Sequence, residues 1–191
     1  MPRDTSRLDM SVDFQPVNIA VLTISDTRTP DDDRSGDLLA ERIAEDGHVL
    51  ARRMIVTDDV DRITARLQDW IEDPQIDVIV TTGGTGLTGR DSTPEAFDRT
   101  VEKAIPGFGE LFRQLSYEKI GTSTIQSRAV AGVAGGTYLF ALPGSPSGCR
   151  DGWDDILRYQ LDIRHRPCNF VEIMPRLTES ASRRRTSPVD A

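Results

Sequence analysis

The sequence 77-DVIVTTGGTGLTGRDSTP-94 joins an apolar run, a glycine-rich loop and the start of a helix. Residues 77–82 are rich in β-branched side chains, which is typical of a strand covered on both faces. Pro94 suits the first position of the helix that follows. Strand, loop and helix in this order are the unit from which parallel sheets are built. This stretch therefore predicts an α/β fold with a glycine loop at the carboxyl end of a central strand.

The flanking sequence repeats this alternation of strand and helix. Further strands are expected at residues 17–24, 48–56, 129–133 and 138–142. Helices are expected at 35–46 with Ser35 as its cap, at 60–71 capped by Asp58 or Asp59, after Pro94, at 108–120 and at 153–161. The apolar residues of each helix recur at helical spacing, and the strands are nearly continuous in apolar residues. The pattern predicts a mostly parallel sheet with helices on both faces.

Length and charge limit the possible functions. A chain of 191 residues with 37% hydrophobic and 28% charged residues is typical of one globular domain. The domain is expected at 16–177, with mobile polar tails at 1–15 and 178–191; Arg183, Arg184 and Arg185 are expected to be a solvated part of the second tail. A net charge of −8 argues against non-specific binding to nucleic acid or to an anionic membrane.

Cellular location is predicted from the cysteines and from hydropathy. The two cysteines, Cys149 and Cys168, are too few for a disulfide framework and match no zinc spacing. The N-terminus has no apolar signal segment, and no apolar run reaches the length of a membrane helix. These features predict a cytoplasmic protein.

The loop Thr82-Gly83-Gly84-Thr85-Gly86 is the first candidate binding site. Glycines allow backbone amides to approach a ligand and to direct several N–H groups at one anion, for which phosphate is the natural choice. A tight turn without a ligand is the alternative interpretation. Three glycines with two threonine hydroxyls favour the phosphate site.

Two standard nucleotide motifs nearly match this loop. Gly84, Gly86 and Gly89 satisfy the dinucleotide pattern G-x-G-x-x-G. In a dinucleotide site this pattern opens a helix directly and is followed by a strand that ends in an acid about 20 residues on. This sequence meets neither condition. The same spacing also fits a P-loop, yet Arg90 and Asp91 stand where a P-loop needs Lys and then Ser or Thr. The sequence therefore disfavours a nucleotide-dependent oxidoreductase and a Walker-type NTPase.

Asp91 indicates that a cation accompanies the anion. A carboxylate beside an anion-binding loop is repulsive unless a cation lies between them, and Mg²⁺ is the natural candidate. Asp58 and Asp59 follow another strand and are expected at the same edge of the sheet, where either could also cap a helix. Two carboxylates together with nucleotide phosphates would complete a magnesium site.

Further motifs identify a family. After TTGGTG come RDSTPEA, PGFGELFRQLS, GTSTIQSRAVAG, LPGSPSGCR and RPCNF. Together, over about residues 15–175, these motifs resemble the MoaB/MogA family of molybdenum cofactor biosynthesis proteins. The ordered set is much more specific than the glycine loop alone. The resemblance implies a three-layer α/β/α sandwich with a mostly parallel central sheet that binds molybdopterin.

The resemblance also implies an activity and a set of site residues. Active members of the family are molybdopterin adenylyltransferases, which transfer AMP from Mg·ATP to the terminal phosphate of the pterin and release pyrophosphate. Asp58 and Asp91 match the two acidic residues of the family and are expected to be catalytic and to bind Mg²⁺ together with the ATP phosphates. The residues expected to bind substrate are Ser25, Asp26, Thr82, Gly83, Gly84, Thr85, Gly86, Ser127, Pro143, Gly144 and Ser145.

Two further expectations follow from the resemblance. Some members keep the fold but have other residues at the position of Asp58, so a non-catalytic molybdopterin-binding or scaffold protein of the same pathway is the alternative function. The retained acid favours an active enzyme. The family also implies a homo-oligomer, either a trimer or a hexamer.

Overall fold

The computed structural model describes residues 7–179. Residues 1–6 and 180–191, including Arg183, Arg184 and Arg185, lie outside the described part. The strands are β1 (Asn18–Ile24), β2 (Val49–Val56), β3 (Val78–Thr82), β4 (Lys103–Ala104), β5 (Val130–Ala134) and β6 (Thr137–Leu142). The α-helices are α1 (Arg34–Glu45), α2 (Val60–Ile71), α3 (Thr93–Thr100), α4 (Pro106–Ile120), α5 (Pro146–Gly152), α6 (Arg158–Gln160) and α7 (Phe170–Ile173). The short helices η1 (Gly121–Gln126) and η3 (Met174–Arg176) are 3-10 turns, and η2 (Trp153–Leu157) is a π turn.

The strands form one six-stranded sheet in the order β2-β1-β3-β6-β5-β4. The pairs β1–β2, β1–β3 and β3–β6 are parallel, whereas β5 is antiparallel to both β6 and β4. The prediction of a mostly parallel sheet is therefore confirmed. The short strand β4 was not predicted, because a strand of two exposed residues has no alternation of apolar and polar side chains.

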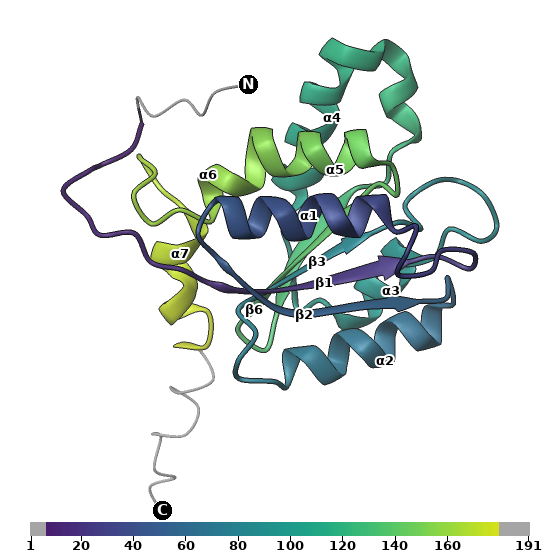
Figure 1. Cartoon of the computed structure of the whole chain (residues 1–191), viewed down its shortest axis with the longest axis horizontal. Helices are drawn as coiled ribbons and strands as arrows, with labels where there is room; N and C mark the ends of the chain where they lie inside the picture. Colours follow the sequence, from purple (N-terminus) through teal and green to yellow (C-terminus); the bar gives the residue numbers. More distant parts are fainter. Residues whose placement is uncertain (1–6, 180–191) are drawn as a thin grey trace, which may run out of the picture.

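Helices cover both faces of the sheet, as Figure 1 shows: α1, α4 and α5 lie on one face and α2 and α3 on the other. Each central strand contributes to two separate hydrophobic cores because successive side chains point to opposite faces. In β6, Tyr138, Phe140 and Leu142 belong to the core under α1, α4 and α5, whereas Leu139 and Ala141 belong to the core under α2 and α3. Fully burying one such large apolar side chain contributes about 1.5–3 kcal/mol. The three-layer α/β/α sandwich is confirmed.

Two helix caps decide which acidic side chains stay available. Asp33, not Ser35, caps α1: its buried carboxylate accepts the Gly36 N–H at 3.0 Å and pairs with Arg53 at 2.9 Å. The prediction of Ser35 as the cap was wrong. Asp33 is selected among the three successive aspartates at 31–33 because its carboxylate also pairs with Arg53 in the neighbouring strand β2. Asp59 caps α2 by accepting the Arg62 N–H at 3.0 Å. The carboxylate of Asp58 is therefore not used as a cap.

The N-terminal segment contacts residues 164–166 through side chains and backbone that precede the expected start of the domain. Leu8 forms an antiparallel bridge with His165, Asp9 pairs with Arg166 at 3.2 Å, and the Arg164 guanidinium lies 5.0 Å from the centre of the Phe14 ring. Contacts with the C-terminal part of the domain are therefore made by residues that precede the predicted boundary at residue 16. These contacts are a backbone bridge, one ion pair and one cation–π contact, which hydrophobic periodicity does not reveal.

The predicted closing helix begins earlier, at Pro146, and contains a π turn but no gap as far as Gln160. The π turn η2 separates α5 from α6, and at its start the indole N–H of Trp153 donates to Asp46 Oδ2 at 2.8 Å.

No helix among residues 7–179 is both long enough and apolar enough to span a membrane.

Candidate functional site

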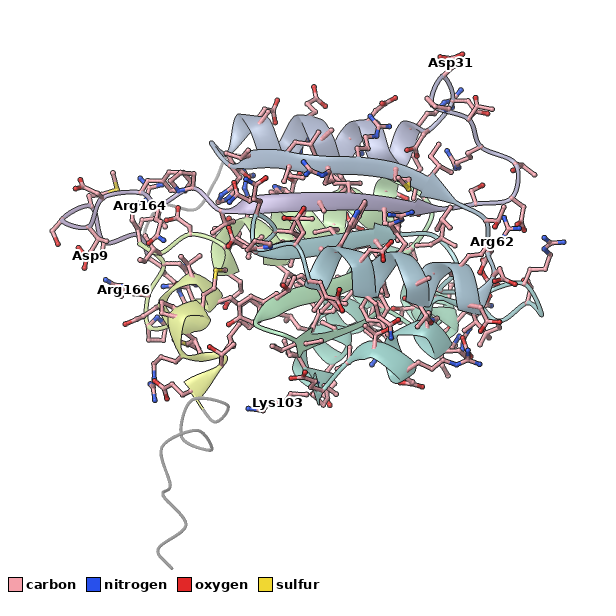
Figure 2. The ribbon with its side chains drawn as sticks, turned by 90° about the horizontal axis from the view of Figure 1, so that it is seen from below. Asp9, Asp31, Arg62, Lys103, Arg164 and Arg166 are labelled. Carbon is pink, nitrogen blue, oxygen red and sulfur yellow. The ribbon has the colours of Figure 1, made fainter. Side chains whose placement is uncertain are left out.

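The candidate site lies at the carboxyl ends of the parallel strands, where four loops follow β1, β2, β3 and β6. Ligands bind at this edge in open α/β sheets. In Figure 2, the labelled residues Asp31 and Arg62 mark this end of the molecule. Asp9, Arg164 and Arg166 lie at the opposite end. The N-terminal contacts therefore lie away from the site.

The glycine loop after β3 requires glycine at two successive positions. Gly83 and Gly84 have φ angles of +104° and +64°, which side chains with a Cβ rarely adopt. A Cβ on Gly83 would lie 2.2 Å from the carbonyl oxygen of Ile24 in β1. Thr93 supports the loop, because its N–H donates to the Gly84 carbonyl at 3.0 Å and its hydroxyl to the Gly83 carbonyl at 2.8 Å. The loop is thus held rigidly against the end of β1.

Thr82 is placed below this loop rather than in it. The residue is fully buried, and its hydroxyl donates to the Pro143 carbonyl at 2.8 Å and lies 3.0 Å from Cys149 Sγ. Burial raises the pKa of Cys149 to about 11, against the opposing hydrogen bond from Thr82, so this thiol is protonated at neutral pH. Thr82 therefore connects β3 to the loop after β6, and its hydroxyl is used within the protein.

A depression of about 350 Å³ opens above the glycine loop. Its lining consists of Gly84, Thr85, Gly86, Asp91, Gln126, Ser127, Pro143, Gly144 and Ser145. All of these except Gln126 were predicted site residues. Gln126 was missed, although it directly precedes the predicted Ser127 at the end of η1.

A second depression of about 460 Å³ lies on the other side of Asp91. It is lined by Val60, Leu87, Thr88, Gly89, Asp91, Ser92, Glu95, Arg99 and Arg128. Asp91 lines both depressions and therefore stands in the wall between them. Arg128 was considered as a partner for phosphates, and none of the other residues around this second depression was among the predicted catalytic, substrate-binding or metal-binding residues.

The carboxylate of Asp91 is fixed by its own loop. Its Oδ2 accepts the N–H of Thr88 at 2.8 Å and the hydroxyl of Thr88 at 2.7 Å. Burial raises the pKa of Asp91, but the hydrogen bonds from Thr88 and Gly86 and the charge of Arg128 outweigh it, so the pKa is lower than usual. Asp91 is therefore ionised at neutral pH.

Asp58 reaches the same loop from the end of β2. Its Oδ1 accepts the Ser92 hydroxyl at 2.6 Å and the Ser92 N–H at 3.1 Å. Its Oδ2 lies 2.8 Å from the point where a Cβ on Gly84 would stand, so the carboxylate packs directly against the glycine loop. Asp26 supports this arrangement, because it accepts the Asp58 N–H at 3.1 Å and forms an ion pair with Arg90.

Arg128 ties both ends of the 86–91 loop together. Its Nε donates to the Gly86 carbonyl and its Nη2 to the Asp91 carbonyl, each at 2.7 Å. Its Nη1 pairs with Glu95, and this hydrogen bond lowers the pKa of Glu95. Since the guanidinium is a planar fork of donors, three simultaneous contacts fix the loop in one position.

The remaining predicted residues lie in the loops around the depression. Ser25 Oγ accepts the Arg28 N–H at 3.1 Å, and Ser145 Oγ accepts the Gly148 N–H at 3.1 Å as the cap of α5. Ser127 Oγ accepts the Ala129 N–H at 3.4 Å. These hydroxyls hold their loops in shape. Of the predicted set, Ser25, Asp26, Asp58, Thr82 and Gly83 do not line the depression.

The acidic side chains fit a magnesium site only in part. Among residues 7–179, no three histidine, cysteine or acidic side chains are close enough to hold a metal by themselves. Asp58 and Asp91 offer the oxygen atoms that Mg²⁺ prefers, on either side of the glycine loop. Mg²⁺ commonly binds through one or two carboxylates with substrate phosphates and water. The residues therefore fit Mg²⁺ that arrives with a nucleotide.

A family model and curated proteins match most of this chain. A family model described as "Probable molybdopterin binding domain" matches residues 20–163. Molybdenum cofactor biosynthesis protein B of Escherichia coli (strain K12) is 48% identical over 161 residues, which cover 84% of this chain and 95% of that protein. The four loops of the site all fall within the matched range.

Solved structures are similar over most of the chain. A crystal structure of molybdenum cofactor biosynthesis protein B has a TM-score of 0.78 at 38% identity, and the match covers 86% of this chain and 98% of that one. The tungsten cofactor synthesizing protein MoaB from Pyrococcus furiosus has a TM-score of 0.67 at 36% identity, with coverage of 75% and 91%. The chain belongs to the MoaB/MogA family of molybdenum cofactor biosynthesis proteins.

Proposed function

We propose that this protein is a molybdopterin adenylyltransferase, which transfers AMP from Mg·ATP to the terminal phosphate of molybdopterin and releases pyrophosphate. The observation that carries the proposal is the placement of Asp58 and Asp91 against the glycine loop, with Asp91 in the wall of the depression. Backbone amides of the loop suit phosphates, and the carboxylates suit the cation that accompanies them.

Phosphoryl transfer of this kind requires mainly positioning and charge neutralisation. The loop from Gly83 to Gly86 holds the phosphates, and its close packing against β1 together with the hydrogen bonds from Thr93 fixes their place. Asp58 and Asp91 would hold Mg²⁺, which neutralises charge on the leaving pyrophosphate when bound. Arg128 and Thr88 keep Asp91 in place, and Ser92 does the same for Asp58.

The test is an incubation of the purified protein with Mg·ATP, with and without molybdopterin. We expect pyrophosphate and adenylylated pterin, identified by mass, and both should depend on the pterin. If the pterin binds but neither product forms, the protein is a binding or scaffold member of the family and the enzymatic proposal is wrong. A parallel incubation with EDTA tests the requirement for a divalent cation.

We also propose that the protein is a homo-oligomer. In Figure 1, α4 and the segment that follows it extend beyond the rest of their helical layer. Large apolar side chains are exposed there: Leu111 by 41%, Tyr117 by 58%, Ile120 by 57% and Ile125 by 80%. Clustered apolar side chains of this kind are typical of surfaces that bind another protein. Because the family resemblance implies a homo-oligomer, we propose that the partner is a second copy of this chain.

Ile125→Asp is expected to weaken this assembly, because it places a charge in the apolar surface. The mass in solution, measured by light scattering over a dilution series, should fall to the monomer at a protein concentration at least about tenfold higher than for the wild type. Met10→Asp is the matched control, since Met10 is also exposed but lies outside α4 and η1. A monomeric wild type would refute the oligomer, and an unchanged Ile125→Asp profile would exclude this surface.

A further inference from the structure

We infer that Thr88 and Ser92 are positioning residues that hold the two carboxylates of the site in fixed orientations, each by donating two hydrogen bonds to one carboxylate oxygen. This inference rests on the proposed function and assigns roles to two residues outside the predicted site. It also explains how the carboxylates of Asp58 and Asp91, which come from two different loops, are held in a fixed position relative to each other.

The two contacts have the same form. Thr88 donates its N–H and its hydroxyl to Asp91 Oδ2 at 2.8 and 2.7 Å. Ser92 donates its N–H and its hydroxyl to Asp58 Oδ1 at 3.1 and 2.6 Å. In each pair, no side chain among residues 7–179 donates a hydrogen bond to the other carboxylate oxygen. In Asp58 that oxygen, Oδ2, lies beside Gly84, and in Asp91 the backbone N–H of Gly86 is a further donor to the carboxylate.

Two donors on one oxygen restrict a side chain that otherwise rotates easily. The terminal torsion of aspartate has a broad, roughly two-fold energy profile, so a single hydrogen bond leaves the carboxylate free to turn. A second donor from the same residue fixes the plane of the carboxylate. Hydrogen bonds to a charged group are stronger than those between neutral groups, so a pair of donors selects one orientation.

Thr88 lies in a short loop whose two ends are bound by one side chain. Arg128 donates to the carbonyl groups of Gly86 and Asp91, which fixes the ends of this segment relative to each other. Ser92 follows directly and reaches across to Asp58 at the end of β2. The two carboxylates are therefore set relative to each other through residues 88–92. A merely structural hydroxyl would stabilise the fold without affecting metal binding.

The test compares isosteric and conservative variants. Thr88→Val and Ser92→Ala remove the hydroxyl and keep the backbone N–H, whereas Thr88→Ser and Ser92→Thr restore a hydroxyl. Thr100→Val is the matched control, because the Thr100 hydroxyl donates to the Ala96 carbonyl at 2.8 Å and contacts no carboxylate. Three quantities are measured for each protein: the melting temperature, the affinity for Mn²⁺ in the presence of ATP by electron paramagnetic resonance, and kcat and KM with molybdopterin.

Thr88→Val and Ser92→Ala should each lower the Mn²⁺ affinity and kcat about tenfold and leave KM for the pterin within about twofold. Thr88→Ser and Ser92→Thr should recover most of both losses. Thr100→Val should lower only the melting temperature. If Thr88→Val and Ser92→Ala bind Mn²⁺ as tightly as the wild type, the inference is wrong.

A different result would refute the proposed function alone. If the wild type neither binds Mn²⁺ with ATP nor turns over, crystal structures of Thr88→Val and Ser92→Ala decide the positioning roles. Rotated carboxylates at Asp91 and Asp58 would support the inference, and unchanged carboxylates would overturn it.

Discussion

Asp91→Asn is expected to lower the turnover of molybdopterin adenylylation by a factor of about 10² or more while the fold stays intact. Asp91 is the one acidic residue shared by both depressions, and its low pKa keeps it charged at neutral pH. Asparagine has nearly the same shape, and its Oδ1 can still accept from Thr88. The substitution therefore removes the charge that would hold the cation but keeps the loop. Steady-state rates with saturating Mg·ATP and pterin measure the effect.

The control is Asp98→Asn, which removes an exposed charge from the neighbouring helix α3 without touching the glycine loop. Its turnover should equal that of the wild type, and both variants should melt within a few degrees of it. Unchanged turnover in Asp91→Asn would remove this residue from catalysis.

Gly83→Ala is expected to lower the free energy of unfolding by about 3 kcal/mol and to abolish binding at the glycine loop. The φ angle of +104° is strained for alanine, and the new Cβ would meet the Ile24 carbonyl oxygen at 2.2 Å. That oxygen belongs to the backbone of a central strand, so it cannot move aside as a flexible side chain would. Urea denaturation followed by circular dichroism measures the loss.

Gly89→Ala provides the comparison within the same loop. No atom lies within 4 Å of a Cβ at Gly89, and its φ angle is not positive. This variant should change the free energy of unfolding by no more than about 0.5 kcal/mol. Equal losses in the two variants would show that the cost does not depend on the positive φ angle and the close Ile24 contact at position 83, which would refute the prediction for Gly83.

The sheet and its main helices could be predicted because their signals are local. The apolar runs at 17–24, 77–82 and 138–142 are confirmed as central strands, and the periodicity of residues 60–71 as α2. The features that could not be predicted depend on contacts between distant segments. Asp33 caps α1 because Arg53 lies beside it, and residues 7–15 are held by the segment 164–166. Neither contact leaves a pattern in the nearby sequence.

The loops of the candidate site could be predicted from the sequence, but the hydrogen bonds that hold its side chains could not. The glycine loop, Asp91 and the turn at 143–145 follow strands, and their expected meeting at one depression is found. Thr82 was expected to bind substrate but is buried beneath the loop. Thr88 and Ser92 were not predicted to hold the carboxylates, nor Arg128 to bind the carbonyl groups of the loop, since these roles depend on how the loop folds back on itself. A hydroxyl three positions before Asp91, at Thr88, is the signal that could have indicated a self-bonded turn.

The order of strands in the sheet also determines at which stage of folding the binding site forms. Its four loops follow β1, β2, β3 and β6, and every pairing among these strands is parallel and spans an intervening helical segment. Such non-local pairings are slow to form, because the connecting chain must be ordered first. A partly folded chain therefore has no complete binding depression. Ligand binding reports the completion of folding, and a ligand at 100 times its Kd would stabilise the finished fold by about 2.7 kcal/mol.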